Sequence, residues 1–95
     1  MLEKQLEAKI VKIAKDLDIL CYKFISPPNR GVPDRIFICR CSIFFIEFKS
    51  DKGKLTVQQE HTIDKFRNKR VTVHVVNNIE DGLKILEKHK ECWRL

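Results

Sequence analysis

Apolar side chains recur along the chain with two different spacings, and each spacing predicts a type of secondary structure. Between residues 2 and 17 the apolar positions lie three or four residues apart, which is typical of an amphipathic helix. Residues 56–68 and 79–90 show the same spacing, and Thr56 is well placed to cap the first of these two helices. Shorter apolar runs that are rich in β-branched and aromatic residues predict four strands, at 20–25, 36–39, 43–48 and 71–76.

The order of these elements predicts an α/β fold. It runs helix, three strands, helix, strand, helix, with helices that can cover the faces of a central sheet. Only Arg40 to Ser42 separates the strands at 36–39 and 43–48, so we expect these two strands to form a hairpin. The sequence contains no repeat, linker or low-complexity segment, and we expect residues 1–95 to form a single domain.

Three charged residues interrupt the apolar background near the ends of the hairpin strands. Asp34 stands where the first strand opens, while Glu47 and Lys49 lie two residues apart near the end of the second and so face one side. A sheet that brings these ends together places two carboxylates and an ammonium in one small volume, which suits divalent metal chemistry on phosphate. Each residue also has a plainer interpretation, as a turn residue or a partner in an ion pair. An acid among aromatic residues is nevertheless costly to bury without a cation.

A further carboxylate is expected from the first helix. Glu7 continues the line of Ile10 and Ala14, so it borders the buried face and could reach a metal ion directly or through water. Glu3 lies one turn earlier on the same side, and the sequence leaves open which of the two is used. Both also suit a plainer role, because acids in the first turns of a helix complement its dipole.

The charge balance favours a polyanionic partner such as DNA. Lys and Arg together number 19 against 13 for Asp and Glu, a net charge of +6. The basic residues nearest the candidate site, which we expect to contact phosphates, are Lys23, Arg30, Arg35, Lys52 and Lys54. A basic surface alone is also compatible with a non-catalytic nucleic-acid-binding module, which remains an alternative.

Other classes of protein are disfavoured by what the sequence does not contain. None of the four cysteines forms a Cys-x-x-Cys pair, and the three histidines have no shared ligand spacing, which argues against a structural zinc site. The chain has no apolar run of about 18 residues, no signal-peptide pattern and no lipidation motif. We therefore expect no membrane association and a cytoplasmic location.

Four segments of the chain form a recognisable combination when they are taken together: Glu7, Gly31-Val-Pro-Asp34, Glu47-Phe-Lys49 and Leu55-Thr-Val-Gln-Gln59. This combination resembles the virus-type replication-repair nuclease (VRR-NUC) domain, a branch of the restriction-endonuclease-like superfamily with a PD-(D/E)xK signature. The resemblance covers nearly the whole chain and implies an αβββαβ core with a C-terminal helix and a central mixed sheet flanked by helices. One departure is Asp18, which stands where the family usually has a glycine after the first helix.

The resemblance implies a metal-dependent endonuclease that hydrolyses DNA phosphodiester bonds. Mg²⁺, or Mn²⁺ in its place, would be held by oxygen ligands, and the expected ligands are Asp34, Glu47, the backbone carbonyl of Phe48 and Glu7. Lys49 would orient the attacking water or stabilise the developing charge. The family also places Gln59 so that it points into the site.

Small stand-alone members of the family look like dimeric DNA-repair enzymes that act on branched DNA such as four-way (Holliday) junctions. We expect a homodimer, because cutting such a junction symmetrically takes two active sites. Candidate interfaces are the apolar side of the helix at 79–90 and the tail at 92–95, although the same side chains can instead cover the sheet. A nuclease that acts on flaps or plain duplex also remains open.

Overall fold

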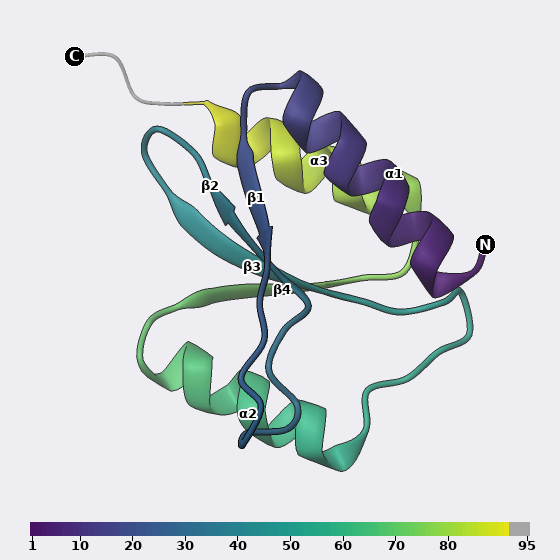
Figure 1. The fold of residues 1–95 in the computed structure, drawn as a ribbon, viewed down its shortest axis with the longest axis vertical. Helices are drawn as coiled ribbons and strands as arrows, with labels where there is room; N and C mark the ends of the chain where they lie inside the picture. The colour runs from purple at the N-terminus through teal and green to yellow at the C-terminus, as the bar shows by residue number, and fades with distance from the viewer. Residues whose placement is uncertain (92–95) are drawn as a thin grey trace.

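A computed structural model of the chain describes residues 1–91 and contains every helix and strand that the sequence predicts (Figure 1). In chain order the elements are α1 (Glu3–Asp16), β1 (Leu20–Lys23), β2 (Arg35–Ile38), β3 (Ile43–Phe48), α2 (Val57–Asn68), β4 (Thr72–Val76) and α3 (Ile79–Lys90). Strand β1 ends at Lys23 and not at residue 25 as expected. Its partner β2 begins only after Pro33, which has no backbone N–H to donate to a longer β1. None of these helices is long and apolar enough to cross a membrane.

The four strands form one mixed sheet in the order β1-β2-β3-β4. Strands β1, β2 and β3 are antiparallel neighbours, whereas β4 runs parallel to β3. Helix α2 makes the crossover that parallel pairing requires. The sheet lies between two helical layers, with α1 and α3 on one side and α2 on the other (Figure 1). The expected α/β fold, a mixed sheet flanked by helices, is therefore confirmed.

Each face of the sheet buries its own apolar cluster, and this decides where Glu47 points. The larger cluster, under α1 and α3, includes Phe37, Phe44, Ile46 and Phe48, while Phe45 belongs to the smaller cluster under α2. Successive residues of a strand alternate between faces. Glu47 therefore shares the face of Phe45 and points toward the side that α2 covers.

The apolar side of α3 packs against the rest of the protein. Leu86 is fully buried, and Ile79 packs against the larger cluster. Gly82 lies so close to α1 that an added Cβ would collide with the side chain of Ile10. Ile79 and Leu86 therefore pack inside the protein, whereas Leu83 is partly exposed, and a dimer interface on α3 stays a prediction. The tail at 92–95, the other candidate interface, lies outside the described residues.

Three turns among the described residues contain a residue in the left-handed backbone region: Asp18, Gly31 and Arg70, the last with φ 64° between α2 and β4. Asp18, at the position where the family usually has glycine, has φ 61°, a conformation that Asp adopts more readily than most residues. Gly31 has φ 85°, and a Cβ there would lie 2.9 Å from both the Gln58 carbonyl oxygen and Thr62 Oγ1. The loop before Asp34 is thereby packed directly against α2.

Candidate functional site

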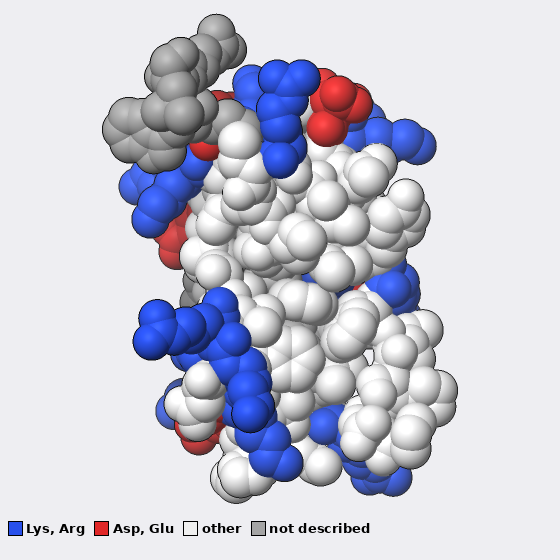
Figure 2. All heavy atoms as spheres, turned by 90° about the vertical axis from the view of Figure 1, so that its left-hand side faces the viewer, with Lys and Arg blue, Asp and Glu red and all other residues white. Residues whose placement is uncertain are grey.

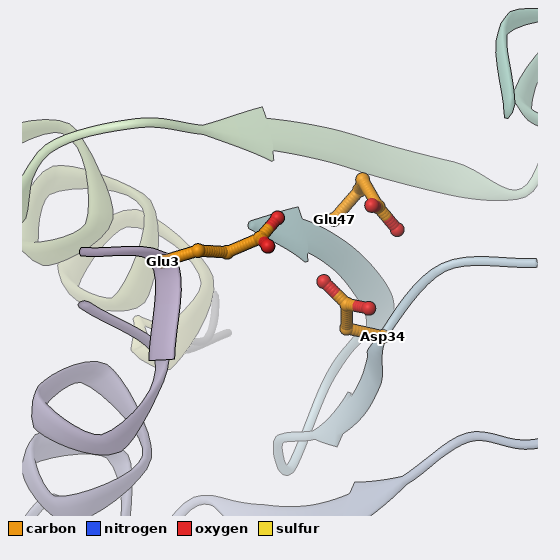
Figure 3. Close-up of side chains that lie close together, drawn as sticks. All are labelled: Glu3, Asp34 and Glu47. Atoms are coloured by element: carbon orange, nitrogen blue, oxygen red, sulfur yellow. The ribbon is translucent and has the colours of Figure 1, made fainter. Parts of the chain in front are cut away.

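Three carboxylates from three different elements converge at one end of the sheet. Glu3 begins α1, Asp34 immediately precedes β2, and Glu47 lies near the end of β3. One carboxylate oxygen from each residue lies within 4.8 Å of the others, and the three side chains point toward one another (Figure 3). Asp34 and Glu47 meet because β2 and β3 are antiparallel, which pairs Arg35 with Ile46. We refer to these three residues as the carboxylate cluster.

Glu47 is the most buried member of the cluster, with 2% of its surface exposed. Its Oε2 accepts a hydrogen bond from Gln59 Nε2 at 2.9 Å and lies 3.8 Å from Lys49 Nζ. Its Oε1 is buried and has no hydrogen-bond partner among the described residues. Burial, followed by the charge of Asp34, raises the pKa of Glu47 to about 8, although the Lys49 ammonium opposes this. A buried, unpartnered oxygen beside two further carboxylates is a place where a cation would be stabilised.

The Asp34 carboxylate is held in place by the backbone. Its Oδ2 accepts the Phe48 N–H at 2.8 Å, and the Asp34 carbonyl accepts the Phe24 N–H at 2.9 Å. Burial raises the pKa of Asp34, while the Phe48 N–H opposes that shift. The N–H of Phe48 thus orients a carboxylate, whereas the role of its carbonyl as a metal ligand remains a prediction.

Gln59 is oriented by the start of α2. Thr56 Oγ1 accepts the Gln59 N–H at 3.1 Å, and Gln59 Oε1 accepts the Thr56 N–H at 2.9 Å, which together make a capping box. Because the amide oxygen of Gln59 is committed to Thr56, its amide nitrogen is left to face Glu47. The helix cap therefore determines that Gln59 presents a donor to the cluster.

Glu7 and Arg35 pair with each other at the edge of this site. Arg35 Nε donates to Glu7 Oε2 at 2.7 Å, and the two side chains are only 23% and 15% exposed. Arg35 shares a sheet face with Phe37, the face covered by α1, so its guanidinium reaches Glu7. Glu3, one turn earlier on α1, is the helix residue that converges with Asp34 and Glu47.

The other basic candidates lie around the cluster. Lys49 follows β3, and its side chain is 14% exposed. Lys23 ends β1, near enough to Asp34 for its charge to oppose the burial that raises the pKa of that carboxyl. Arg30 is exposed in the loop before β2, and Lys52 and Lys54 are exposed in the segment between β3 and α2. Their contacts with DNA remain predictions.

A second polar cluster lies on the opposite face of the sheet. The Nε2 atoms of His74 and His89 are 2.9 Å apart, and Ser42 Oγ lies 3.0 Å from His89 Nδ1. Burial, followed by the charge of His89, lowers the pKa of His74 to about 4. The pair is therefore neutral near pH 7 and shares a hydrogen bond that the sequence spacing did not indicate.

Comparison with known proteins supports the same fold. No protein-family model matches the sequence. The chain is 36% identical over 58 residues to "Putative nuclease p44" of Acyrthosiphon pisum secondary endosymbiont phage 1, a match that covers 60% of this chain and 62% of that relative. It is similar to a solved structure described as "VRR_NUC domain", with a TM-score of 0.80 and 24% identity over 90% of this chain and 94% of the other. The chain therefore has the fold of the VRR-NUC domain.

Proposed function

We propose that this protein is a VRR-NUC nuclease, a divalent-metal-dependent endodeoxyribonuclease of the cytoplasm, in which Glu3, Asp34 and Glu47 hold the metal ion. The observation that carries the proposal is the unpartnered Oε1 of Glu47, buried within a cluster of three carboxylates. The fold and the similarity to a protein named as a nuclease support it.

The cluster fits a hard divalent cation. Mg²⁺ prefers oxygen ligands and is usually bound by one or two carboxylates together with water and phosphate, and Mn²⁺ takes the same ligands. Without a cation, three carboxylates this close cannot all be ionised cheaply, which agrees with the raised pKa values of Asp34 and Glu47. A bound ion would supply charge stabilisation at the phosphate and a more acidic water.

The residues around the cluster have separate tasks. Gln59 donates to one oxygen of Glu47 and leaves the other free to face a ligand. The Lys49 ammonium lies 3.8 Å from Glu47 Oε2, and in this proposal it donates to the attacking water or to a phosphate oxygen. Because most of the Lys49 side chain is buried, solvent screens this charge only weakly.

Glu7 acts in this account as a positioning residue. Its ion pair with Arg35 ties α1 to the first residue of β2, directly beside Asp34. Glu3 lies one turn away on the same helix, so the pair helps to set the distance between Glu3 and the other two carboxylates. This role differs from the direct or water-mediated contact with the metal that we expected for Glu7.

For the substrate, we propose branched DNA such as a four-way junction, cut by a homodimer. Two symmetrical cuts require two sites in a fixed relation, which a twofold dimer supplies. Flaps and plain duplex are the alternatives that a substrate comparison separates. A non-catalytic DNA-binding module is the less economical explanation, because it would have no use for a buried carboxylate that costs folding energy.

We expect cleavage to require a divalent metal and to be lost in Asp34→Asn, because the amide removes the charge that binds the cation. The loss should be about 10³-fold or more, equivalent to roughly 4 kcal/mol of transition-state stabilisation. The assay uses labelled duplex, nicked, flap and four-way-junction DNAs with Mg²⁺, Mn²⁺ or EDTA.

Asp64→Asn, at an exposed acid on α2 outside the cluster, is the matched control and should cleave normally. Full activity in EDTA, or in Asp34→Asn, would refute the assigned site. Binding without cleavage of any of these DNAs would favour the non-catalytic module.

A further inference from the structure

A groove lies between the loop that precedes Asp34 and helix α2, beside the carboxylate cluster. Its volume is about 370 Å³, and residues of both segments line it. In Figure 1 this loop passes over α2 in the lower part of the molecule. None of the three clustered carboxylates lines the groove, so it is a separate feature with its own chemistry.

The two walls of the groove are fixed to each other. Gly31 approaches α2 too closely to leave room for a Cβ, and Thr62 Oγ1 donates to the Arg30 carbonyl at 3.2 Å. Within the loop, the Asn29 N–H donates to the Ser26 carbonyl and Asn29 Nδ2 donates to Ser26 Oγ, both at 2.8 Å. The groove is thus formed before any ligand binds, which lowers the cost of binding.

The groove combines cations and hydrogen-bond donors with three apolar side chains, those of Phe24, Val32 and Phe66. Arg30 lines it from the loop, and His61 and Lys65, four residues apart on one helix face, line it from α2. Among residues 1–91, neither Arg30 nor Lys65 takes part in an ion pair. The acids of the same helix, Glu60 and Asp64, do not line the groove. Such a surface suits an anion that accepts several hydrogen bonds, as a phosphate group does.

Further positive charge lies on the side of the molecule shown in Figure 2. Lys and Arg side chains gather over its lower part, where α2 lies, and only limited Asp and Glu surface appears among them. Beyond the groove, the end of α2 and the turn that follows it add Arg67, Lys69 and Arg70. A polyanion that occupies the groove would therefore meet further positive charge along the helix.

The groove opens close to the carboxylate cluster. Val32, which lines it, is two residues before Asp34, and Gln58 directly precedes Gln59, the partner of Glu47. Two residues of extended chain span at most about 7 Å. A DNA strand with one phosphate at the cluster would reach the groove within about one or two nucleotides.

We propose that this groove binds a backbone phosphate of the DNA strand, one or two nucleotides from the bond that is cut. Arg30 and Lys65 are its two cationic contacts, and His61 is a further donor. The distance from the cut rests on the proposed nuclease function. The binding of a DNA phosphate in the groove does not depend on that function.

The test is the salt dependence of DNA binding, measured by fluorescence anisotropy in EDTA so that no metal-dependent cleavage occurs. The proteins are wild type, Arg30→Gln, Lys65→Gln and, as a matched control, Lys84→Gln at an exposed lysine on α3 that does not line the groove. Each groove variant should lower the slope of log K against log salt by about 0.9 on duplex DNA, or about 0.7 on a single strand. The control should keep most of the wild-type slope.

Equal slopes for Arg30→Gln, Lys65→Gln and Lys84→Gln would overturn the groove as a phosphate site. Both groove residues are exposed, and matching melting curves would confirm that the variants fold. Lowered slopes together with no cleavage of any DNA would refute the nuclease and leave the groove intact.

For the cleaved strand, a neutral methylphosphonate one or two nucleotides from the cut locates the contact. The methylphosphonate should lower the cleavage rate of wild type several-fold relative to unmodified DNA. The Arg30→Gln/Lys65→Gln double variant should cleave the modified and unmodified DNAs at the same rate. An equal slowing of both proteins would place the contact elsewhere.

Discussion

Glu47→Gln should make the metal-free protein more stable while it removes nuclease activity. The pKa of Glu47 is raised from 4.5 to about 8, so between these pH values the folded state holds a proton that the unfolded state has released. The free energy of unfolding therefore falls as the pH rises from about 4.5 to 8. Glutamine has nearly the same shape and cannot ionise, so it removes this penalty, with a gain on the order of 1–3 kcal/mol at pH 8.

Urea denaturation in EDTA at several values between pH 5 and pH 8 measures this effect. The stability difference between Glu47→Gln and wild type should grow with pH. His74 has the opposite dependence, because its lowered pKa makes stability rise with pH, but it is present in both proteins and cancels in the difference. Glu60→Gln, at an exposed acid of α2, should show no such trend. A variant that is less stable than wild type at pH 8 would contradict the electrostatic account of the cluster.

Lys49→Ala should lower the cleavage rate by about 10²- to 10³-fold at saturating Mg²⁺, with little change in DNA affinity. Among the described residues, Lys49 is the cation paired with Glu47, and its ammonium can stabilise charge that develops at the reacting phosphate. The same substitution should lower metal-free stability at pH 8, because the positive charge that opposes the raised pKa of Glu47 is lost.

Single-turnover cleavage measured at increasing Mg²⁺ concentrations separates these effects. Lys49→Ala should reach a low plateau, whereas a residue that only helps to hold the metal would be rescued by more Mg²⁺. Lys84→Ala, which removes an exposed lysine of α3 outside the candidate site, should change the plateau little. A plateau near that of wild type in Lys49→Ala would show that the ammonium has no role in the chemical step.

The hairpin explains why part of the candidate site could be predicted from the sequence. Strand β3 and helices α2 and α3 have the expected bounds, and an antiparallel hairpin necessarily brings the start of β2 beside the end of β3. The proximity of Asp34 and Glu47 follows from that local geometry. The Thr-x-x-Gln spacing at 56–59, a capping-box signal, could also have predicted how the Gln59 amide is turned.

The contribution of α1 could not be predicted in the same way, because it depends on contacts between distant segments. Helical spacing places Glu3 and Glu7 on one side, and only the docking of α1 decides which of them reaches Asp34. That docking is set by the approach of Gly82 to Ile10 and by the pairing of Arg35 with Glu7. Neither contact leaves a local sequence signal.

Calorimetric titration of Mn²⁺ into wild type, Glu3→Gln and Glu7→Gln tests the central claim, that the carboxylate cluster is a metal site, most directly. Wild type should bind Mn²⁺, Glu3→Gln should bind it about tenfold more weakly or worse because a charged ligand is lost, and Glu7→Gln should lose less. Mn²⁺ binding that is unchanged in Glu3→Gln and abolished in Glu7→Gln, or no binding to wild type at all, would contradict the assignment of the metal to Glu3, Asp34 and Glu47.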